Sequence, residues 1–321
     1  METWLALVLA SSVFAAISAY FDNYLTDNYF KERTPHAQKC FYGPAYAVIA
    51  ILILVFYPYF FHVDPFAIST ALLLFLAGVI SSIASIPYYS ALESENTTGA
   101  AIFFQLSPIF YLTLGALLLS ERITGTHLIA FLILLAAPMI IILSTRKRGK
   151  KLEYRAAFFL LLYIIIYSFS QIVFVIAERD SGASGSSLPI AMAIAFMFAG
   201  KGCCDIILSI FIKKWRMRYR HILKKSKWKV LAPLLANTTI WIFVEFFYRG
   251  AMVSGQVAIV SAVGTATQLI ATFLLGLLFT IIWPSFGREK LDKRSVVVHL
   301  IATVVAVAGI VLIESPGLFG G

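Results

Sequence analysis

The stretch YYSALESENTTGAAIFFQLSPIFYLTLGALLL, residues 88–119, contains the pattern that decides the fold. It begins at the aromatic end of an apolar run, passes through a short turn of small and polar residues, and enters a second apolar run, Gly99–Leu119. A helix of about 20 apolar residues has the length that crosses the hydrocarbon core of a bilayer. We therefore predict that Gly99–Leu119 spans a membrane.

Similar runs occupy roughly two thirds of the chain, at about 20 residues each. Of the 321 residues, 60% are apolar and 13% are charged, whereas soluble domains have about 25% charged residues. The gaps between the runs are too short for a soluble domain, and helices satisfy their own backbone hydrogen bonds in lipid. We predict an all-α integral membrane protein with ten transmembrane helices: Thr3–Tyr20, Phe41–Phe61, Phe66–Leu92, Gly99–Leu119, His127–Leu143, Ala156–Ile176, Leu188–Ile212, Val230–Phe247, Val257–Trp283 and Val296–Ile313.

The basic residues lie almost entirely in alternate loops. Of the 26 Lys and Arg, 22 fall on one side of the predicted membrane and three on the other, while Lys201 lies within a span. Because basic loops stay in the cytoplasm, we predict cytoplasmic basic loops, both termini on the extracytoplasmic side, and a plasma (inner) membrane location. The net charge of +10 therefore does not indicate a nucleic-acid partner.

The densest basic segment, residues 213–229, allows two interpretations that are compatible with each other. Trp215, Tyr219, Ile222 and Leu223 recur at helical spacing, which is typical of an interfacial helix on anionic membrane lipids. The second interpretation is an ordinary cytoplasmic loop of the kind that sets membrane orientation.

The opening stretch has a weak echo 160 residues later, in YRGAMVSGQVAIVSAVGTATQLIATFLLGLLF from Tyr248. Each half contains five spans. Because five is an odd number, the second half begins on the opposite side of the membrane and crosses it with the opposite polarity. Inverted repeats of this kind underlie alternating access in secondary transporters, whose sites lie between the halves. We predict a first repeat in residues 1–145, a basic linker in 146–155 and a second repeat in 156–321.

The first half also resembles the EamA-like family of the drug/metabolite transporter (DMT) superfamily. The matching elements are Ala91-Leu92, Ala100-Ala101, the turn Gln105–Pro108 and the segment Leu119–Ile123. The resemblance implies a ten-helix carrier of small metabolites built from two five-helix repeats. It leaves the metabolite open, because the superfamily transports amino acids, sugars, nucleotide sugars, cations and drugs. By the same resemblance, Gln105 lines the central cavity.

Four charged residues lie in or at the end of predicted spans, and a charge at the centre of a span costs about 2.5–3.5 kcal/mol on insertion scales. Lys201 and Asp205 are four residues apart, as are Glu245 and Arg249, so each pair shares a helix face. One interpretation is that these residues serve in coupling; the other is that they only neutralise each other. We expect Arg249 to extend its side chain towards the headgroups, because it lies near the end of its span.

Glu245 is the preferred candidate for a transport role. It shares a polar stripe with Asn237 and Trp241, and a buried carboxylate binds a cationic group or takes up a proton as coupling ion. Beside Arg249 or Lys201 it suits a zwitterion such as an amino acid. Polar and aromatic residues of other spans complete the predicted substrate-binding set: Tyr88, Tyr89, Gln105, Tyr163, Tyr167, Gln171, Asn237, Trp241, Glu245 and Gln268.

The sequence thus favours a secondary transporter, an exporter or exchanger of small polar metabolites such as amino acids. It contains no nucleophile elbow, HExxH or phosphate-binding glycine loop, so we expect no enzyme activity, cofactor or bound metal. The alternative is a non-transporting membrane scaffold or lipid-handling protein that acts through residues 213–229. Monomer and homodimer both stay open.

Overall fold

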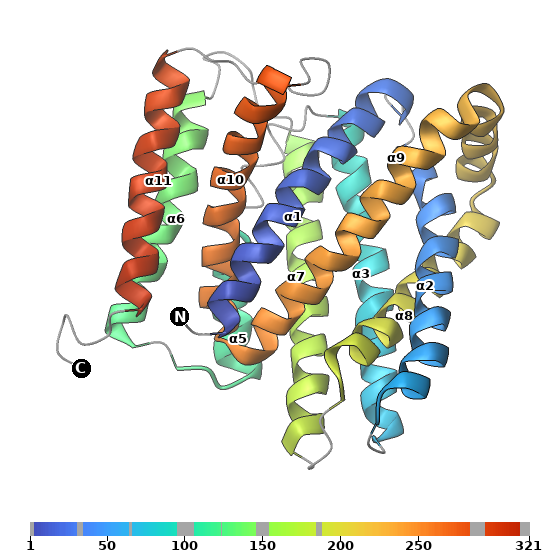
Figure 1. Ribbon diagram of the computed structural model, residues 1–321, viewed down its shortest axis with the longest axis horizontal. Coiled ribbons are helices and arrows are strands. Elements are labelled where there is room, and N and C mark those ends of the chain that lie inside the picture. The colour runs from blue at the N-terminus through green and yellow to red at the C-terminus, as the bar shows by residue number, and fades with distance from the viewer. Residues whose placement is uncertain are drawn as a thin grey trace.

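The computed structural model describes residues 3–30, 35–63, 66–94, 106–122, 124–145, 154–183, 188–282 and 293–314. Within these ranges the chain is helical and forms no strand (Figure 1). A π-helical turn, η1 (Thr26–Phe30), and a 3₁₀ turn, η2 (Pro35–Gln38), lie between the first two helices. The α-helices are α1 (Thr3–Leu25), α2 (Lys39–Phe60), α3 (Ile68–Ser94), α5 (Ser107–Leu118), α6 (Gly125–Thr145), α7 (Tyr154–Ala183), α8 (Ile190–Phe211), α9 (Lys213–Ser254), α10 (Val257–Ile282) and α11 (Lys293–Glu314).

Each predicted span overlaps one of these helices, so the apolar runs located the helices correctly. The first part of the predicted span Gly99–Leu119 lies outside the described residues, and α5 covers its second part. Seven described helices are long and apolar enough to cross a membrane, and three shorter apolar stretches lie in α5, α6 and α11. The described chain is therefore an all-α protein of the membrane-spanning type.

The outer surface of the bundle is apolar, as expected for contact with lipid. Phe60 is 70% exposed, Leu117 is 72% exposed and Phe211 is 80% exposed. A water-soluble monomer rarely exposes large apolar side chains over so much of its surface. The exposed faces of α2, α5 and α8 thus fit a hydrocarbon environment.

Helix α9 joins the basic segment 213–229 and the eighth predicted span into one helix of 42 residues. No Gly or Pro interrupts residues 213–232, and the helix also continues through Pro233. The apolar stripe of the segment packs on the protein: Trp215 and Ile222 are 7% and 6% exposed, and the Trp215 ring stacks on His36 with centroids 4.9 Å apart. The segment is a helix, but this stripe covers protein rather than lipid.

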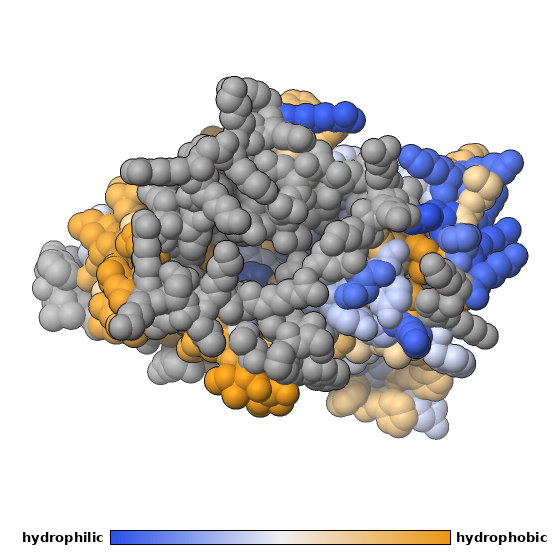
Figure 2. Space-filling model, turned by 90° about the horizontal axis from the view of Figure 1, so that it is seen from above, coloured by the Kyte–Doolittle hydropathy of each residue, from blue (hydrophilic) through white to orange (hydrophobic). Residues whose placement is uncertain are grey.

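The bundle has two unlike ends. We call the end where α1 ends and α9 begins the basic end, and the opposite end, where α9 ends and α10 begins, the far end (Figure 1). Helix α1 begins and α11 ends at the far end. Figure 2 views the basic end, where hydrophilic residues gather over one side.

The largest helix contacts join a helix before residue 146 to a helix after residue 153. Helix α3 packs on α7 and α8, α2 packs on α8, α1 packs on α9 and α10, and α6 packs on α11. Figure 1 shows the last of these pairs at one edge of the bundle and α2 with α8 near the other. The two halves of the chain are therefore interleaved.

Two glycines allow α3 and α8 to touch through their backbones. A Cβ atom on Gly78 would lie 1.9 Å from the Met197 carbonyl oxygen, and one on Gly200 would lie 1.9 Å from the Phe75 carbonyl oxygen. Small residues permit this close approach between membrane helices. No other residue fits at either position without moving backbone.

Candidate functional site

A continuous row of aromatic rings runs from the basic end into the middle of the bundle. The Tyr163 ring lies 5.3 Å from Tyr167 and 5.2 Å from Tyr88, measured between centroids. Tyr88 is 5.3 Å from Tyr89, which lies 5.6 Å from His36. The structure thus joins the tyrosines that the sequence placed in two separate stripes, on α3 and α7.

Asp205 pairs with Lys39 of α2 and not with Lys201. The Lys39 Nζ lies 2.6 Å from Asp205 Oδ1 and donates to the Ser82 carbonyl oxygen at 2.8 Å. The Ser82 hydroxyl also donates to Asp205 Oδ1, at 2.6 Å. The expected pair of Lys201 with Asp205 is therefore wrong, and Lys201 instead places its Nζ 4.5 Å from the centre of the Tyr46 ring.

Glu245 and Arg249 form the expected pair on α9, but Arg249 does not reach the headgroups. Its Nε donates to Glu245 Oε2 at 2.7 Å, and the two side chains are 0% and 2% exposed. The guanidinium carbon lies 4.2 Å from the centre of the Phe174 ring of α7. Because α9 continues to Ser254, Arg249 is still inside the bundle.

Asn237 links α9 to the carboxylate of Asp22, which lies beyond the end of the first predicted span. Its Nδ2 donates to Asp22 Oδ1 at 2.7 Å and to the Tyr42 hydroxyl at 3.2 Å. The Ser18 hydroxyl donates to the Asn237 Oδ1 at 2.7 Å. Asp22 was missed because α1 extends to Leu25, five residues beyond the predicted span.

Several of these groups line a space inside the bundle. Asp22, Tyr88, Tyr163, Tyr167 and Lys201 are all half-buried, and they come from the four helices α1, α3, α7 and α8. Ring contacts join Tyr88 to Tyr163 and Tyr163 to Tyr167, so these half-buried side chains gather between the helices. In the view onto the basic end, hydrophilic surface is visible at depth (Figure 2).

The far end is closed by a clasp of charged groups and helix ends, formed by Glu121 and Arg179. The Arg179 Nη1 lies 2.8 Å from Glu121 Oε1, and its Nη2 donates to the Gly255 carbonyl oxygen at 2.8 Å, beyond the end of α9. Glu121 Oε2 accepts the backbone N–H of Val257, the first residue of α10, at 3.0 Å. The clasp joins both halves of the chain.

The remaining predicted site residues are less well connected. Gln171 is 1% exposed, and neither polar atom of its amide has a hydrogen-bond partner in the described structure. Trp241 is half-buried and its Nε1 likewise lacks one. Gln268 is half-buried on α10, where its backbone carbonyl oxygen accepts a hydrogen bond from the Thr272 hydroxyl at 2.7 Å. Gln105 lies outside the described residues.

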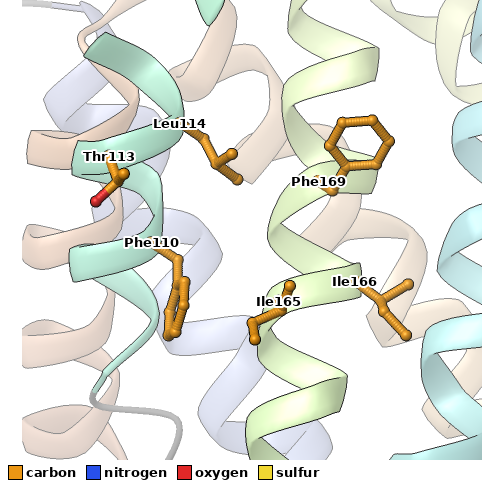
Figure 3. A pocket seen from close by; sticks show the side chains of 6 residues that line it. All are labelled: Phe110, Thr113, Leu114, Ile165, Ile166 and Phe169. Atoms are coloured by element: carbon orange, nitrogen blue, oxygen red, sulfur yellow. The ribbon is translucent and has the colours of Figure 1, made fainter. Parts of the chain in front are cut away.

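One groove of about 270 Å³ opens between α5 and α7, but it differs in character from the polar space. Figure 3 shows its lining, which consists of Phe110, Thr113, Leu114, Ile165, Ile166 and Phe169. The Thr113 hydroxyl points away from α7 and donates to the Ile109 carbonyl oxygen at 3.0 Å. The groove therefore offers only apolar contacts and does not suit a polar ligand.

No group of three His, Cys, Asp or Glu side chains in the described ranges could hold a metal ion. What the described site provides is two buried ion pairs, an accessible carboxylate, an accessible ammonium and a tyrosine wall. This arrangement suits binding of a small polar molecule by charge, hydrogen bonds and ring contacts.

Comparison with known proteins identifies the fold alone. No family model matches the sequence, and no curated protein matches it either. Among the matching solved structures is one titled "Crystal structure of protein", with a TM-score of 0.63 and 13% identity over 97% of this chain and 96% of that chain. At that identity the likeness concerns the course of the helices and not the activity.

Proposed function

We propose that the protein is a secondary transporter, an exporter or exchanger that moves small polar metabolites across a membrane by alternating access, as the EamA-like resemblance implies. The observation that carries the proposal is the enclosed polar space, which receives groups from both halves and is sealed at one end. Tyr88 and Asp22 come from the first half, whereas Tyr163 and Lys201 come from the second. A site between two halves is what a rocking carrier requires.

The helix contacts support an inverted repeat of five helices. In an inverted repeat, the helices of the second half, α7 to α11, would match those of the first half in order: α1, α2, α3, α5 and α6. Exchanging each helix for its match turns the contact of α3 with α7 into the contact of α9 with α1. Both contacts are among the largest in the molecule. The contacts of α2 with α8, α5 with α10 and α6 with α11 exchange with themselves, and all three are present.

The described conformation corresponds to a carrier that is closed at the far end. Glu245 and Arg249 are sealed there, and the clasp of Glu121 with Arg179 lies beyond them. To open the far end, the Glu121–Arg179 pair must break, and the Glu245–Arg249 pair must leave the buried position it now occupies. We propose that the basic end faces the cytoplasm of a plasma membrane, so that this conformation faces inwards.

Cysteine labelling tests alternating access directly. In a chain whose native cysteines are replaced by serine, Ser85→Cys reports on α3 near the tyrosine wall, and Ala258→Cys reports on the sealed far end, where Ala258 is 1% exposed. An impermeant maleimide is added to the basic-end side for the first and to the far-end side for the second. We expect a transported solute to change the two labelling rates in opposite directions.

Each labelling experiment needs a solute to drive it. A thermal-unfolding screen against amino acids, amines, sugars and nucleotide sugars supplies one, because a ligand that binds only the folded chain raises its melting temperature. Labelling rates that rise or fall together at both reporters would refute alternating access. A conductance far above carrier turnover would favour a channel instead.

The alternative, a scaffold or lipid-handling protein working through residues 213–229, makes an opposite prediction. Lys213, Lys214 and Lys224 are exposed on this segment and are available to anionic lipid headgroups. Under the carrier proposal, replacing the three with Gln leaves solute uptake within about twofold, because surface substitutions usually change stability by no more than about 0.5 kcal/mol. Under the alternative, the same variant loses its activity.

A further inference from the structure

Two opposite charges towards the basic end of the bundle lack an ion-pair partner among the described residues. Lys39 with Asp205, and Glu245 with Arg249, neutralise each other in contacts of 2.6 and 2.7 Å. Asp22 and Lys201 take part in no ion pair within the described part of the chain. Charges inside a helix bundle are normally paired, and these two half-buried groups are not, so they need an explanation.

Asp22 faces the tyrosine-lined space. Its only hydrogen-bond partner among the described residues is the amide of Asn237, at 2.7 Å, which leaves its second oxygen unused. The same Asn237 amide donates to the Tyr42 hydroxyl at 3.2 Å, and the Tyr42 ring lies 6.1 Å from the Tyr46 ring. Asn237 therefore connects Asp22 to the tyrosines of α2.

Lys201 borders the same space from α8. Its ammonium lies over the face of Tyr46, which is the neighbour of Tyr42. Tyr42 in turn accepts from the Asn237 amide that also bonds Asp22. A cation over an aromatic ring gains part of what it loses in leaving water, and the Lys201 ammonium donates no hydrogen bond to the described residues. Asp22 and Lys201 thus present opposite charges to one enclosed, accessible space.

We propose that Asp22 and Lys201 are the two poles of a binding site for a small zwitterion. The cationic group of the ligand pairs with Asp22, and its carboxylate or other anionic group pairs with Lys201. The inference rests on the proposed carrier function and names its substrate class. It replaces Glu245 and Arg249 as the charges that meet the ligand, because those two are paired and sealed in the described conformation.

Other ligand classes fit the charges less well. A neutral sugar leaves both charges without a counter-charge, and burying an unpaired charge is costly. An anion satisfies Lys201 but is repelled by Asp22, and a simple cation has the converse problem. Only a ligand carrying both signs neutralises both groups.

The test matches changes in the ligand to changes in the protein. For L-alanine, L-leucine and L-phenylalanine, the amino acid is compared with its decarboxylated amine and with its deaminated acid, by thermal unfolding of the full chain. The wild type is expected to bind at least one amino acid about tenfold more tightly than either fragment of it. Asp22→Asn should remove the preference for the amino acid over the acid, and Lys201→Gln should remove its preference over the amine.

Two control variants carry the same chemical changes on the surface. Asp180→Asn and Lys224→Gln alter exposed residues and should keep both preferences. If Asp22→Asn or Lys201→Gln fails to fold, Asp22→Glu and Lys201→Arg serve instead: retained charge should keep the order of the three ligands.

The possible failures are distinguishable. Preferences that stay unchanged in both variants would overturn the two-pole site. A response to glucose or to a nucleotide sugar alone would overturn the zwitterion assignment and leave the carrier function standing. No response to any solute, combined with no uptake into proteoliposomes, would count against both proposals.

Discussion

The two ends of the interface between the halves treat charge in opposite ways. Towards the far end, Glu245 and Arg249 are paired and almost fully buried, and the Glu121–Arg179 clasp ties helix ends together beyond them. Towards the basic end, Asp22 and Lys201 are accessible and have no ion-pair partner in the described ranges. Under the carrier proposal, the paired charges hold the interface shut and the unpaired charges receive the ligand.

The clasp draws on the termini of helices as well as on side chains. The start of a helix presents unpaired N–H groups and its end presents unpaired carbonyls. Glu121 accepts an N–H at the start of α10, and Arg179 donates to a carbonyl just past the end of α9. One charge pair therefore fixes three segments, which makes the far end sensitive to single substitutions.

The largest effect on the comparison is expected from Arg249→Met. The change leaves Glu245 buried without its counter-charge, which typically destabilises a protein by about 3–5 kcal/mol. We expect a lower melting temperature in detergent and a substantial recovery in the double variant Glu245→Gln/Arg249→Met. Arg122→Met, at an exposed position of the far end, is the control; equal melting temperatures for the two single variants would contradict the assigned burial.

Glu121→Gln should open the far end without unfolding the bundle. The amide oxygen of Gln can still accept the Val257 N–H, but the ion pair with Arg179 is lost. Arg179 is 32% exposed, so solvent weakens the pair to about 1 kcal/mol, a factor of about five in the open population. Maleimide labelling of Ala258→Cys should accelerate accordingly, and an unchanged rate would exclude the clasp as a lock.

Tyr163→Leu should weaken the receiving side of the interface by a smaller amount. The change removes the ring contacts of Tyr163 with Tyr88 and Tyr167, and one such pair contributes about 0.5–1.5 kcal/mol. We expect ligand affinity to fall about threefold, with little change in labelling at the far end. Titration of the ligand from the thermal screen measures the affinity, and Tyr163→Phe, which keeps the ring, should stay near the wild-type value.

The smallest expected effect is the pH dependence of stability caused by Tyr219, which lies outside the membrane-spanning part of α9. Burial, with a smaller contribution from Cys40, raises the pKa of Tyr219 to about 12. A raised pKa of an acid favours the neutral phenol in the folded state, so this stabilisation is complete below pH 10 and is lost as the pH rises to about 12. Melting curves between pH 9 and 12 should fall less steeply for Tyr219→Phe than for the wild type.

The sequence predicted the positions of the helices well, because apolar runs between short polar turns follow directly from the cost of polar backbone in lipid. It also placed Tyr88, Tyr163 and Asn237 on inward faces. For the basic segment, residues 213–229, the sequence allowed either a loop or a helix. In the structure it is a helix whose apolar side packs on His36.

Pairings between distant segments were not predictable. Spacing favoured Lys201 for Asp205, whereas the partner is Lys39, 166 residues away in the chain. The reason is the contact of α2 with α8: a Cβ on Gly43 would lie 3.0 Å from the Cβ of Asp205, and Lys39 lies one helical turn before Gly43. Only the packed helices reveal that neighbour.

Helix ends explain the other errors. Predicted spans stopped at Tyr20 and Phe247, whereas α1 and α9 run on to Leu25 and Ser254. Asp22 and Arg249 lie within these extensions and so were assigned to a loop and to the headgroups. The spacing of Ser11, Ser18 and Asp22, at seven and four residues, was the signal that α1 continues with one polar face.

The packing of α1 has a consequence for the synthesis and membrane insertion of the protein. Its side chains Ser12 and Tyr20 bond backbone carbonyls 252 residues further along the chain, and Asp22 meets Asn237 after 215. At about 5–20 residues per second, the ribosome needs roughly 10–50 s to supply these partners. Helix α1 thus waits for the synthesis of more than 200 further residues, and during that interval its polar face must be sheltered by water, by the insertion machinery or by a provisional neighbour.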